Sequence, residues 1–236
     1  MKGLFITGTD TGVGKTVVTA TILAWLRHQG IKTGVMKPIE TGVDAKCSSA
    51  ANSDALFLME TGNIEDPLEE VCPFRLKHAA SPYQAALIDN RTLQPKSILS
   101  AYDKLAEKND WMLVEGIGGV RVPITQEYGV VELIRDLGLP ALVVTRYELG
   151  TLNHTLMTLE TLRHSGIAVK GVVFNRTGPG KLDAIAQDQP RIIKELTDIP
   201  VLAEFPYIDK LSTESFSPEY LKKLAGSVDF AGLTRN

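Results

Sequence analysis

The segment GTDTGVGKT, Gly8 to Thr16, has the composition and setting of a loop that binds phosphate. It follows an apolar run and precedes a helical pattern, so the free N–H groups of a helix N-terminus would face an anion there. Gly12 and Gly14 would let the backbone close around that anion. Lys15 would contact the β- and γ-phosphates, and the Thr16 hydroxyl would bind Mg²⁺. The alternative is a glycine-rich turn with a solvated lysine, which the adjoining strand and helix disfavour.

This loop departs in one respect from the usual P-loop pattern, GxxxxGK[ST]. Five residues, rather than the four of that pattern, separate Gly8 from Gly14. A related class of partitioning and division-site ATPases carries a lysine early in the loop, and this chain has Asp10 at the corresponding place. The loop therefore predicts nucleotide binding and argues against that class.

A second lysine, Lys37, follows the apolar run Thr33 to Met36 in the segment MKPIETG. We expect it at the carboxyl end of a strand beside the first strand, where ligands bind in open α/β sheets. Pro38 restricts the backbone before it, which gives Lys37 a more fixed direction than an ordinary surface lysine has. A solvated lysine at a strand end is the alternative. The favoured interpretation places two lysines in one crevice.

Two carboxylates could hold the metal ion. The segment LVEGIGG places Glu115 after an apolar strand, at the same carboxyl edge, where it would resemble a Walker-B acid paired by magnesium. A helix cap is the alternative for Glu115. Asp54, in NSDALFL, is more simply explained by the start of a helix, which Asn52 or Ser53 could cap.

One amide could read the nucleotide base. Asn175 ends the apolar run VKGVVFN, and its side chain offers adenine both a donor and an acceptor. Turn formation explains an isolated asparagine at a strand end equally well.

Composition bounds the remaining possibilities. The chain has 236 residues, of which 44% are hydrophobic and 22% charged, as in soluble globular proteins. A net charge of −3, with the signs interspersed, argues against partners such as nucleic acid or anionic lipid. Cys47 and Cys72 form neither a CxxC pair nor a zinc pattern, which favours a reducing cytoplasm. We expect neither a signal peptide nor a membrane span.

Strands and helices alternate along the chain, which predicts an α/β fold with a mostly parallel central sheet between two helical layers, of the P-loop NTPase type, as one domain over residues 1–236. The expected strands are Leu4–Thr7, Thr33–Met36, Trp111–Val114, Ala141–Thr145, Val169–Phe174 and Val201–Ala203. The expected helices are Lys15–His28, Asn52–Glu60, Lys96–Glu107, Val130–Leu137, Thr151–Ser165 and Leu182–Leu196. Left-handed glycine caps are expected at Gly30, Gly138 and Gly166. Residues 43–95 are irregular and could hold an edge strand and loops.

GTDTGVGKT, KPIETG, NSDA, VEGIGG, LGTLNH and VVFN, in this order, resemble the motifs of the dethiobiotin synthetase family over nearly the whole chain. The five-residue spacing of the phosphate loop matches that family. The resemblance implies a cytoplasmic homodimer that makes dethiobiotin, ADP and phosphate from 7,8-diaminononanoate, carbon dioxide or bicarbonate, and ATP with Mg²⁺.

The resemblance also implies roles for individual residues. It makes Thr16, Asp54 and Glu115 the magnesium ligands, Lys15 and Thr11 the residues at the phosphates, and Lys37 and Thr41 the residues at the reacting end of the substrate. Nucleotide contacts would come from Gly12, Val13, Gly14, Lys15, Thr16, Val17, Gly116, Ile117, Gly118, Asn175, Arg176, Glu204, Phe205 and Pro206. Gly150, Thr151, Leu152 and Asn153 open a helix whose N–H groups would bind the substrate's terminal carboxylate across the dimer interface. Some members carry Glu where this chain has Gly12.

The implied reaction is a ligation. A carbamate formed from one amine and carbon dioxide would take the γ-phosphoryl group of ATP, and the second amine would then close the urea ring and expel phosphate. Lys15, Lys37 and magnesium would stabilise the charge that gathers during these steps. The alternatives are another ATP-dependent ligase of this fold, such as a cobyrinate diamide synthetase, and a nucleotide switch.

Overall fold

The central sheet has six parallel strands in the order β2-β5-β1-β6-β7-β8. The computed structural model describes residues 2–44, 46, 48–209, 216–217, 219–220 and 228–234. The strands are β1 (Lys2–Gly8), β2 (Thr33–Met36), β5 (Trp111–Gly119), β6 (Ala141–Arg146), β7 (Val169–Asn175) and β8 (Val201–Phe205). Two further strands, β3 (Ile39–Thr41) and β4 (Phe74–Leu76), pair with each other in a small separate sheet. Central strands are buried on both faces, which explains their nearly continuous apolar sequences.

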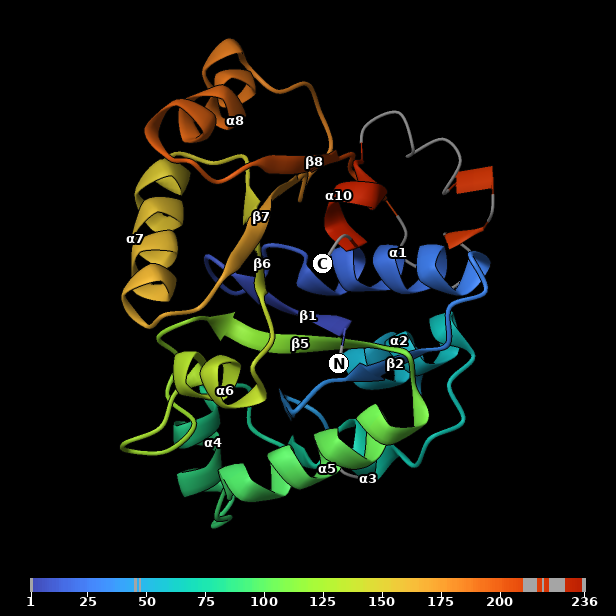
Figure 1. Cartoon of the computed structure of the whole chain (residues 1–236). Helices are drawn as coiled ribbons and strands as arrows, with labels where there is room; N and C mark the ends of the chain where they lie inside the picture. Colours follow the sequence, from blue (N-terminus) through green and yellow to red (C-terminus); the bar gives the residue numbers. More distant parts are fainter. Residues whose placement is uncertain are drawn as a thin grey trace.

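Helices cover both faces of this sheet (Figure 1). One layer contains α1 (Lys15–His28), α2 (Asp54–Gly62) and α10 (Phe230–Thr234), and the other contains α5 (Pro95–Lys108), α6 (Val130–Leu137), α7 (Thr151–His164) and α8 (Ala184–Leu196). The short elements η1 (Ala50–Asn52), α3 (Leu68–Val71) and α4 (Pro82–Ile88) lie in the irregular stretch. The expected three-layer α/β fold is confirmed. No helix in the described residues is long and apolar enough to cross a bilayer.

The bounds of the predicted strands and helices agree with the structure to within a few residues. The main exception is β5, which continues to Gly119. Gly30, Gly138 and Gly166 all have positive φ, as expected of left-handed caps. Cys72 is buried, with its thiol directed at the Phe74 carbonyl, and Cys47 lies outside the described residues.

Two expectations about the sheet are wrong. β2 does not lie beside β1, because β5 pairs with both and separates them. β5 also continues to Gly119, so Glu115 lies inside the strand and not at its end. β2 stops at Met36, opposite Val114, so β2 does not pair with β5 from Glu115 onward. The early end of β2 therefore opens the space that a strand end was expected to provide.

The stretch 43–95 also differs from its expectation. Its one strand, β4, pairs with β3 and not with the edge of the central sheet, and two short helices, α3 and α4, were not predicted. These helices have 4 and 7 residues, too few to show a clear helical period. The C-terminal end of α3 lies beside Lys37, because the Val71 carbonyl accepts a hydrogen bond from the backbone N–H of Lys37 at 2.8 Å.

Candidate active site

A cavity of about 560 Å³ lies at the carboxyl ends of β1 and β2, beside the second half of β5. Its walls come from the loop before α1, the β2–β3 segment, the start of α2 and the end of β5. Predicted site residues that line it are Thr11, Gly12, Gly14, Lys15, Thr16, Val17, Lys37, Thr41, Asp54, Glu115, Ile117 and Gly118. The structure thus brings together segments that are up to about a hundred residues apart in the sequence.

The loop before α1 has the shape its sequence predicts. Gly12 and Gly14 have φ of 75° and 89°, in the left-handed region that favours glycine. α1 begins at Lys15, and the Gly14 carbonyl accepts the first helical hydrogen bond, from Val18, at 3.2 Å. Val13 does not line the cavity but is fully buried beneath the loop. The loop therefore presents a helix N-terminus to the cavity, as an anion site requires.

Lys15 is nearly buried at the base of this loop, where it is 7% exposed. Its Nζ donates to the Asp10 carbonyl at 3.2 Å. Burial, reinforced by the positive charge of Lys37, lowers the pKa of Lys15 to about 8. A nucleotide phosphate would supply the negative charge that this ammonium lacks.

Lys37 forms the centre of a buried ion cluster. Its Nζ lies 2.5 Å from Glu115 Oε1 and 3.0 Å from Asp54 Oδ2, and it donates to the Gly116 carbonyl at 3.2 Å. Burial alone would lower the pKa of Lys37, but the two carboxylates outweigh burial and raise it. Asp54 shows the converse: burial raises its pKa, but the charge and hydrogen bond of Lys37, with help from Thr16 and Lys15, more than offset burial, so the net shift is downward. Lys37 and Asp54 therefore stabilise each other's charged forms.

Thr16, Asp54 and Glu115 fit a magnesium ion. The Thr16 hydroxyl donates to Glu115 Oε1 at 3.0 Å, and it is also close enough to Asp54 to favour the charged form of that carboxyl, lowering its pKa. Glu115 Oε2 is buried and has no hydrogen-bond partner among the described residues, so it can accept a cation. No group of three or more His, Cys, Asp or Glu side chains in the described residues forms a metal cage. Magnesium does not need one, since it uses one or two carboxylates with phosphate and water.

Two residues that the sequence did not single out complete this region. Glu40, 5% exposed, accepts hydrogen bonds from the Ser53 hydroxyl at 2.8 Å and from the backbone N–H of Asp54. Arg146, at the end of β6, lies 3.4 Å from Asp10 Oδ2 and donates to the Thr11 carbonyl at 3.3 Å. The available signal for Glu40 is its place in the segment KPIETG, three residues after Lys37. Arg146 carries no comparable signal, because its contacts are set by the tertiary fold.

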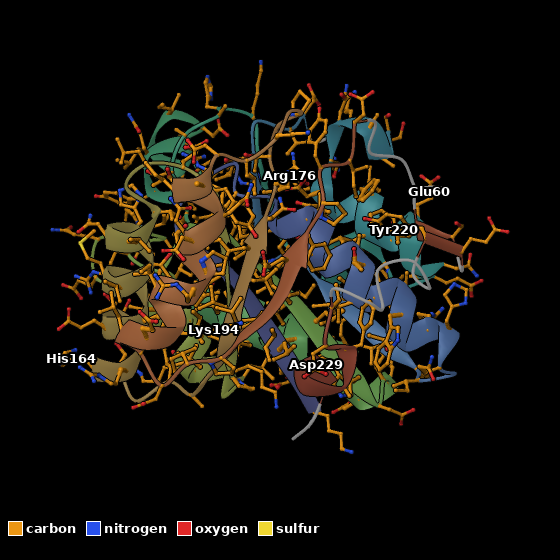
Figure 2. The ribbon with its side chains drawn as sticks, turned by 90° about the horizontal axis from the view of Figure 1, so that it is seen from above. Glu60, His164, Arg176, Lys194, Tyr220 and Asp229 are labelled. Carbon is orange, nitrogen blue, oxygen red and sulfur yellow. The ribbon has the colours of Figure 1, made fainter. Side chains whose placement is uncertain are left out.

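The predicted base-binding residues lie outside this cavity, at the ends of β7 and β8. Asn175 is buried and donates through Nδ2 to the Val13 carbonyl at 3.0 Å, so it holds the phosphate loop. Phe205 is buried in the core, whereas Glu204 is exposed and accepts a hydrogen bond from Tyr147 at 2.6 Å. Figure 2 shows Arg176 at this edge of the sheet, while His164 and Lys194 lie toward the opposite edge. Pro206, which follows Phe205 in the sequence, is exposed.

Gly150, Thr151, Leu152 and Asn153 likewise do not line the Lys37 cavity. They begin α7, where Gly150 has φ of 93° and Leu152 and Asn153 are partly or fully exposed. Thr151 faces inward, and its hydroxyl is 2.7 Å from both the Arg146 carbonyl and the Thr145 hydroxyl. These residues therefore lie apart from the residues that line the Lys37 cavity.

Comparisons with known proteins identify relatives of this chain. Residues 2–215 match a family described as "AAA domain". The chain is 41% identical to the ATP-dependent dethiobiotin synthetase BioD of Thermodesulfovibrio yellowstonii, over 93% of this chain and 95% of that protein. It is 35% identical to the protein of the same name from Bacillus velezensis, over 100% and 99%. For the Methanocaldococcus jannaschii protein the identity is 44%, over 73% and 78%.

The solved structures resemble this chain in fold alone. The MinD-containing complex of Aquifex aeolicus superimposes with a TM-score of 0.62 at 15% identity, covering 99% of this chain and 94% of that one. A ParA family ATPase from Chlorobium tepidum gives 0.58 at 13% identity, covering 99% of both chains. These chains share the architecture at low identity, whereas the sequence relatives are 35–44% identical over most of this chain. On that basis the chain belongs to the family of ATP-dependent dethiobiotin synthetases, enzymes that use ATP to form C–N bonds.

Proposed function

We propose that this enzyme converts 7,8-diaminononanoate, carbon dioxide and ATP to dethiobiotin, ADP and phosphate. One observation carries the proposal: the four charged side chains that the described residues bury, Lys15, Lys37, Glu40 and Glu115, all line one cavity beside the phosphate loop. Burying a charge costs several kcal/mol unless it is paired. Four of them around one space fit a reaction in which phosphate, carbamate and metal charges meet.

The residues divide the task between the two substrates. Lys15 and the N–H groups at the start of α1 would hold the phosphates, with Thr11 on the phosphate side of the loop. Lys37 would neutralise the carbamate, and Thr41, on the same cavity wall, would hydrogen-bond near the reacting nitrogens. Asn175, Arg176 and the segment Glu204–Pro206 would surround the base. Gly12, Val13, Gly14, Val17, Gly116, Ile117 and Gly118 would shape the backbone around the nucleotide.

The bonds balance without a further reactant. One amine adds to carbon dioxide and loses a proton, giving a carbamate. A carbamate oxygen then attacks the γ-phosphorus of ATP, which releases ADP and leaves a carbamic-phosphoric anhydride. The second amine attacks the anhydride carbonyl, closes the five-membered urea and expels phosphate. Lys15 and Lys37 place positive charge at the oxygens where negative charge gathers, before the reaction begins.

Thr16, Asp54 and Glu115 would hold the magnesium ion, which when bound neutralises phosphate oxygens. In the structure the Lys37 ammonium pairs with one oxygen of Asp54 and one oxygen of Glu115. Because the residues that would hold the metal include both carboxylates that pair with Lys37, metal binding would leave the Lys37 ammonium available to the carbamate. The Asp54 and Glu115 carboxylates would then balance the charge of either the lysine or the metal.

A homodimer would complete the site. Gly150, Thr151, Leu152 and Asn153 begin a helix of 14 residues, whose free N–H groups suit a carboxylate, yet they do not line their own chain's Lys37 cavity. We infer that they bind the far carboxylate of the diamine in the partner subunit's site. We also infer that residues 1–236 act as one domain in the cytoplasm, where ATP and a reducing environment are available.

The test is direct. The purified chain is incubated with the diamine, ¹³C-labelled bicarbonate and MgATP, and the product is analysed by mass spectrometry. We expect one labelled carbon in a cyclic urea, with one ADP released per product. ATP hydrolysis without a urea product, or product without ADP, would contradict the proposal.

A further inference from the structure

Glu40 is the buried charge in this cavity to which the proposed reaction gives no task. It lies on β3, three residues after Lys37, and is 5% exposed. Burial raises the pKa of its carboxyl, so keeping this residue here has a cost. Its neighbours show what the carboxyl does in return.

The Glu40 carboxylate accepts the two donors that begin α2. The Ser53 hydroxyl donates to Oε2 at 2.8 Å, and the backbone N–H of Asp54 donates to Oε1. The Ser53 hydroxyl oxygen in turn accepts from Leu56 N at 3.3 Å, as an N-cap does. The first turn of α2 is therefore fixed to β3 through one side chain.

This attachment sets the position of Asp54. Asp54 is the first residue of α2, and its carboxylate faces Lys37 Nζ at 3.0 Å. Lys37 and Glu40 belong to one short segment, whose start is held by the hydrogen bond from Lys37 N to the Val71 carbonyl at 2.8 Å. The segment thus positions the Lys37 ammonium. Three residues later it carries Glu40, which positions Asp54, the carboxylate partner of Lys37.

We propose that Glu40 is a positioning residue for the metal site: it fixes the start of α2 so that the Asp54 carboxylate faces Thr16 and Glu115 across the cavity. The inference rests on the proposed function, in which Asp54 is a magnesium ligand. This positioning role depends on whether an acceptor oxygen of the side chain at position 40 reaches the Asp54 N–H. The negative charge of Glu40 is secondary, since an N–H is satisfied by a neutral oxygen as well.

Two substitutions separate reach from charge. Glu40→Gln keeps the length and one acceptor oxygen for Asp54 N–H, and its amide can donate to Ser53. Glu40→Asp keeps the charge but withdraws the oxygens by one methylene. The readout is the dissociation constant of Mn²⁺ in the presence of ADP, from the electron paramagnetic resonance signal of free Mn²⁺. We expect Glu40→Asp to bind Mn²⁺ about tenfold more weakly, and Glu40→Gln to stay within about twofold of the unmodified enzyme.

Two further variants make the result decisive. Asp183 is the N-cap of α8, and its carboxylate accepts a hydrogen bond from Ala186 N at 2.7 Å. Asp183 does not line the cavity, so Asp183→Ala controls for the loss of a helix cap. We expect it to lower the melting temperature and leave Mn²⁺ binding unchanged. Asp54→Ala tests the ligand itself. If Asp54→Ala binds Mn²⁺ normally, the proposed metal site is wrong. If it weakens Mn²⁺ while Glu40→Asp does not, or if Glu40→Gln is the weaker binder of the pair, the positioning role is overturned and the metal site stands.

Discussion

The two halves of the sheet's carboxyl edge are built from different chemistry. At β1, β2 and β5 the buried polar groups include four charged ones, Lys15, Lys37, Glu40 and Glu115, beside neutral ones such as Thr7 and Ser53. At the ends of β6 and β7 and the start of α7, the buried polar groups among the described residues are neutral: Thr145, Thr151, Thr155 and Asn175. The Thr145 hydroxyl lies 2.7 Å from Thr151 and accepts from Thr155 at 3.0 Å, and the Asn175 amide donates to the phosphate loop at 3.0 Å.

This difference follows from what each half must do. Neutral groups that satisfy one another fix a backbone at little cost, so they suit a half that holds the loop and the base. Buried charges are costly, and replacing them by apolar residues is often neutral or stabilising, so packing does not explain them. The charged half should therefore control the rate of reaction, and the neutral half should control binding.

Lys37→Ala should give the largest effect, because it removes the cation proposed to face the carbamate. We expect turnover to fall by roughly a thousandfold or more, while ADP affinity measured without metal stays within about threefold, since Lys15 and the loop remain. Steady-state turnover and calorimetric ADP titration measure the two quantities.

Lys194→Ala is the matched control for that substitution. Lys194 is an exposed lysine on α8, toward the opposite edge of the sheet (Figure 2). It should retain full turnover. Circular dichroism checks that Lys37→Ala folds, because it leaves Glu115 and Asp54 without their cation. A folded Lys37→Ala enzyme with unchanged turnover would remove the contrast between the two halves.

Gly14→Ala and Gly12→Ala test where the halves meet. Both glycines have positive φ, so both substitutions carry a similar backbone strain of about 1–2 kcal/mol. A Cβ on Gly14 would lie 2.0 Å from Asn175 Nδ2, whereas the nearest atom to a Cβ on Gly12 is Arg146 Nη1 at 3.9 Å. Displacing Asn175 adds roughly 1–3 kcal/mol, so Gly14→Ala should bind ADP about 10- to 100-fold more weakly than Gly12→Ala does. Equal affinities would show that the contact with Asn175 does not shape the loop.

Asn175→Ala should have a smaller effect and affect binding alone. It leaves the Val13 carbonyl without its donor, and we expect ADP affinity to fall about tenfold, with turnover at saturating ATP little changed. In this background Gly14→Ala should become less harmful, because the atom it strikes is gone. A double-mutant cycle measures that coupling. A large loss of turnover in Asn175→Ala would mean that the neutral half also takes part in the chemistry.

The fold could be predicted from the sequence wherever one strand or helix shows its own pattern. Lys15–His28, Thr33–Met36 and Val130–Leu137 have the same bounds in the sequence-based prediction and in the structure. Strand order could not be predicted, because the insertion of β5 between β1 and β2 depends on packing between distant segments. For the same reason Glu115 was placed at a strand end, when it lies inside β5 where β2 has stopped.

The candidate site was predictable where a motif names both the residue and its ligand. Lys15, Thr16, Lys37 and Glu115 meet in one cavity, as their motifs indicated, and Asp54 joins them, as the family resemblance implied. Glu40 and Arg146 were missed, since each acts on other residues of the chain and no spacing rule describes such contacts. The fold comparisons also show the limit of architecture, because MinD and ParA share it at 13–15% identity. The architecture alone therefore does not identify the family, whereas identities of 35–44% over most of the chain do.

Asn153→Asp should have the smallest effect and tests whether the neutral half serves a neighbouring site. A carboxylate at the start of α7 would repel the substrate's terminal carboxylate, so we expect the KM for the diamine to rise about two- to fivefold, with the KM for MgATP unchanged. Mixing this variant with excess Lys37→Ala then locates the contact. If α7 serves the partner, each mixed dimer pairs an intact Lys37 with an intact α7, and the low KM returns. If α7 serves its own chain, every active site keeps Asn153→Asp beside it, and the KM stays high at all mixing ratios.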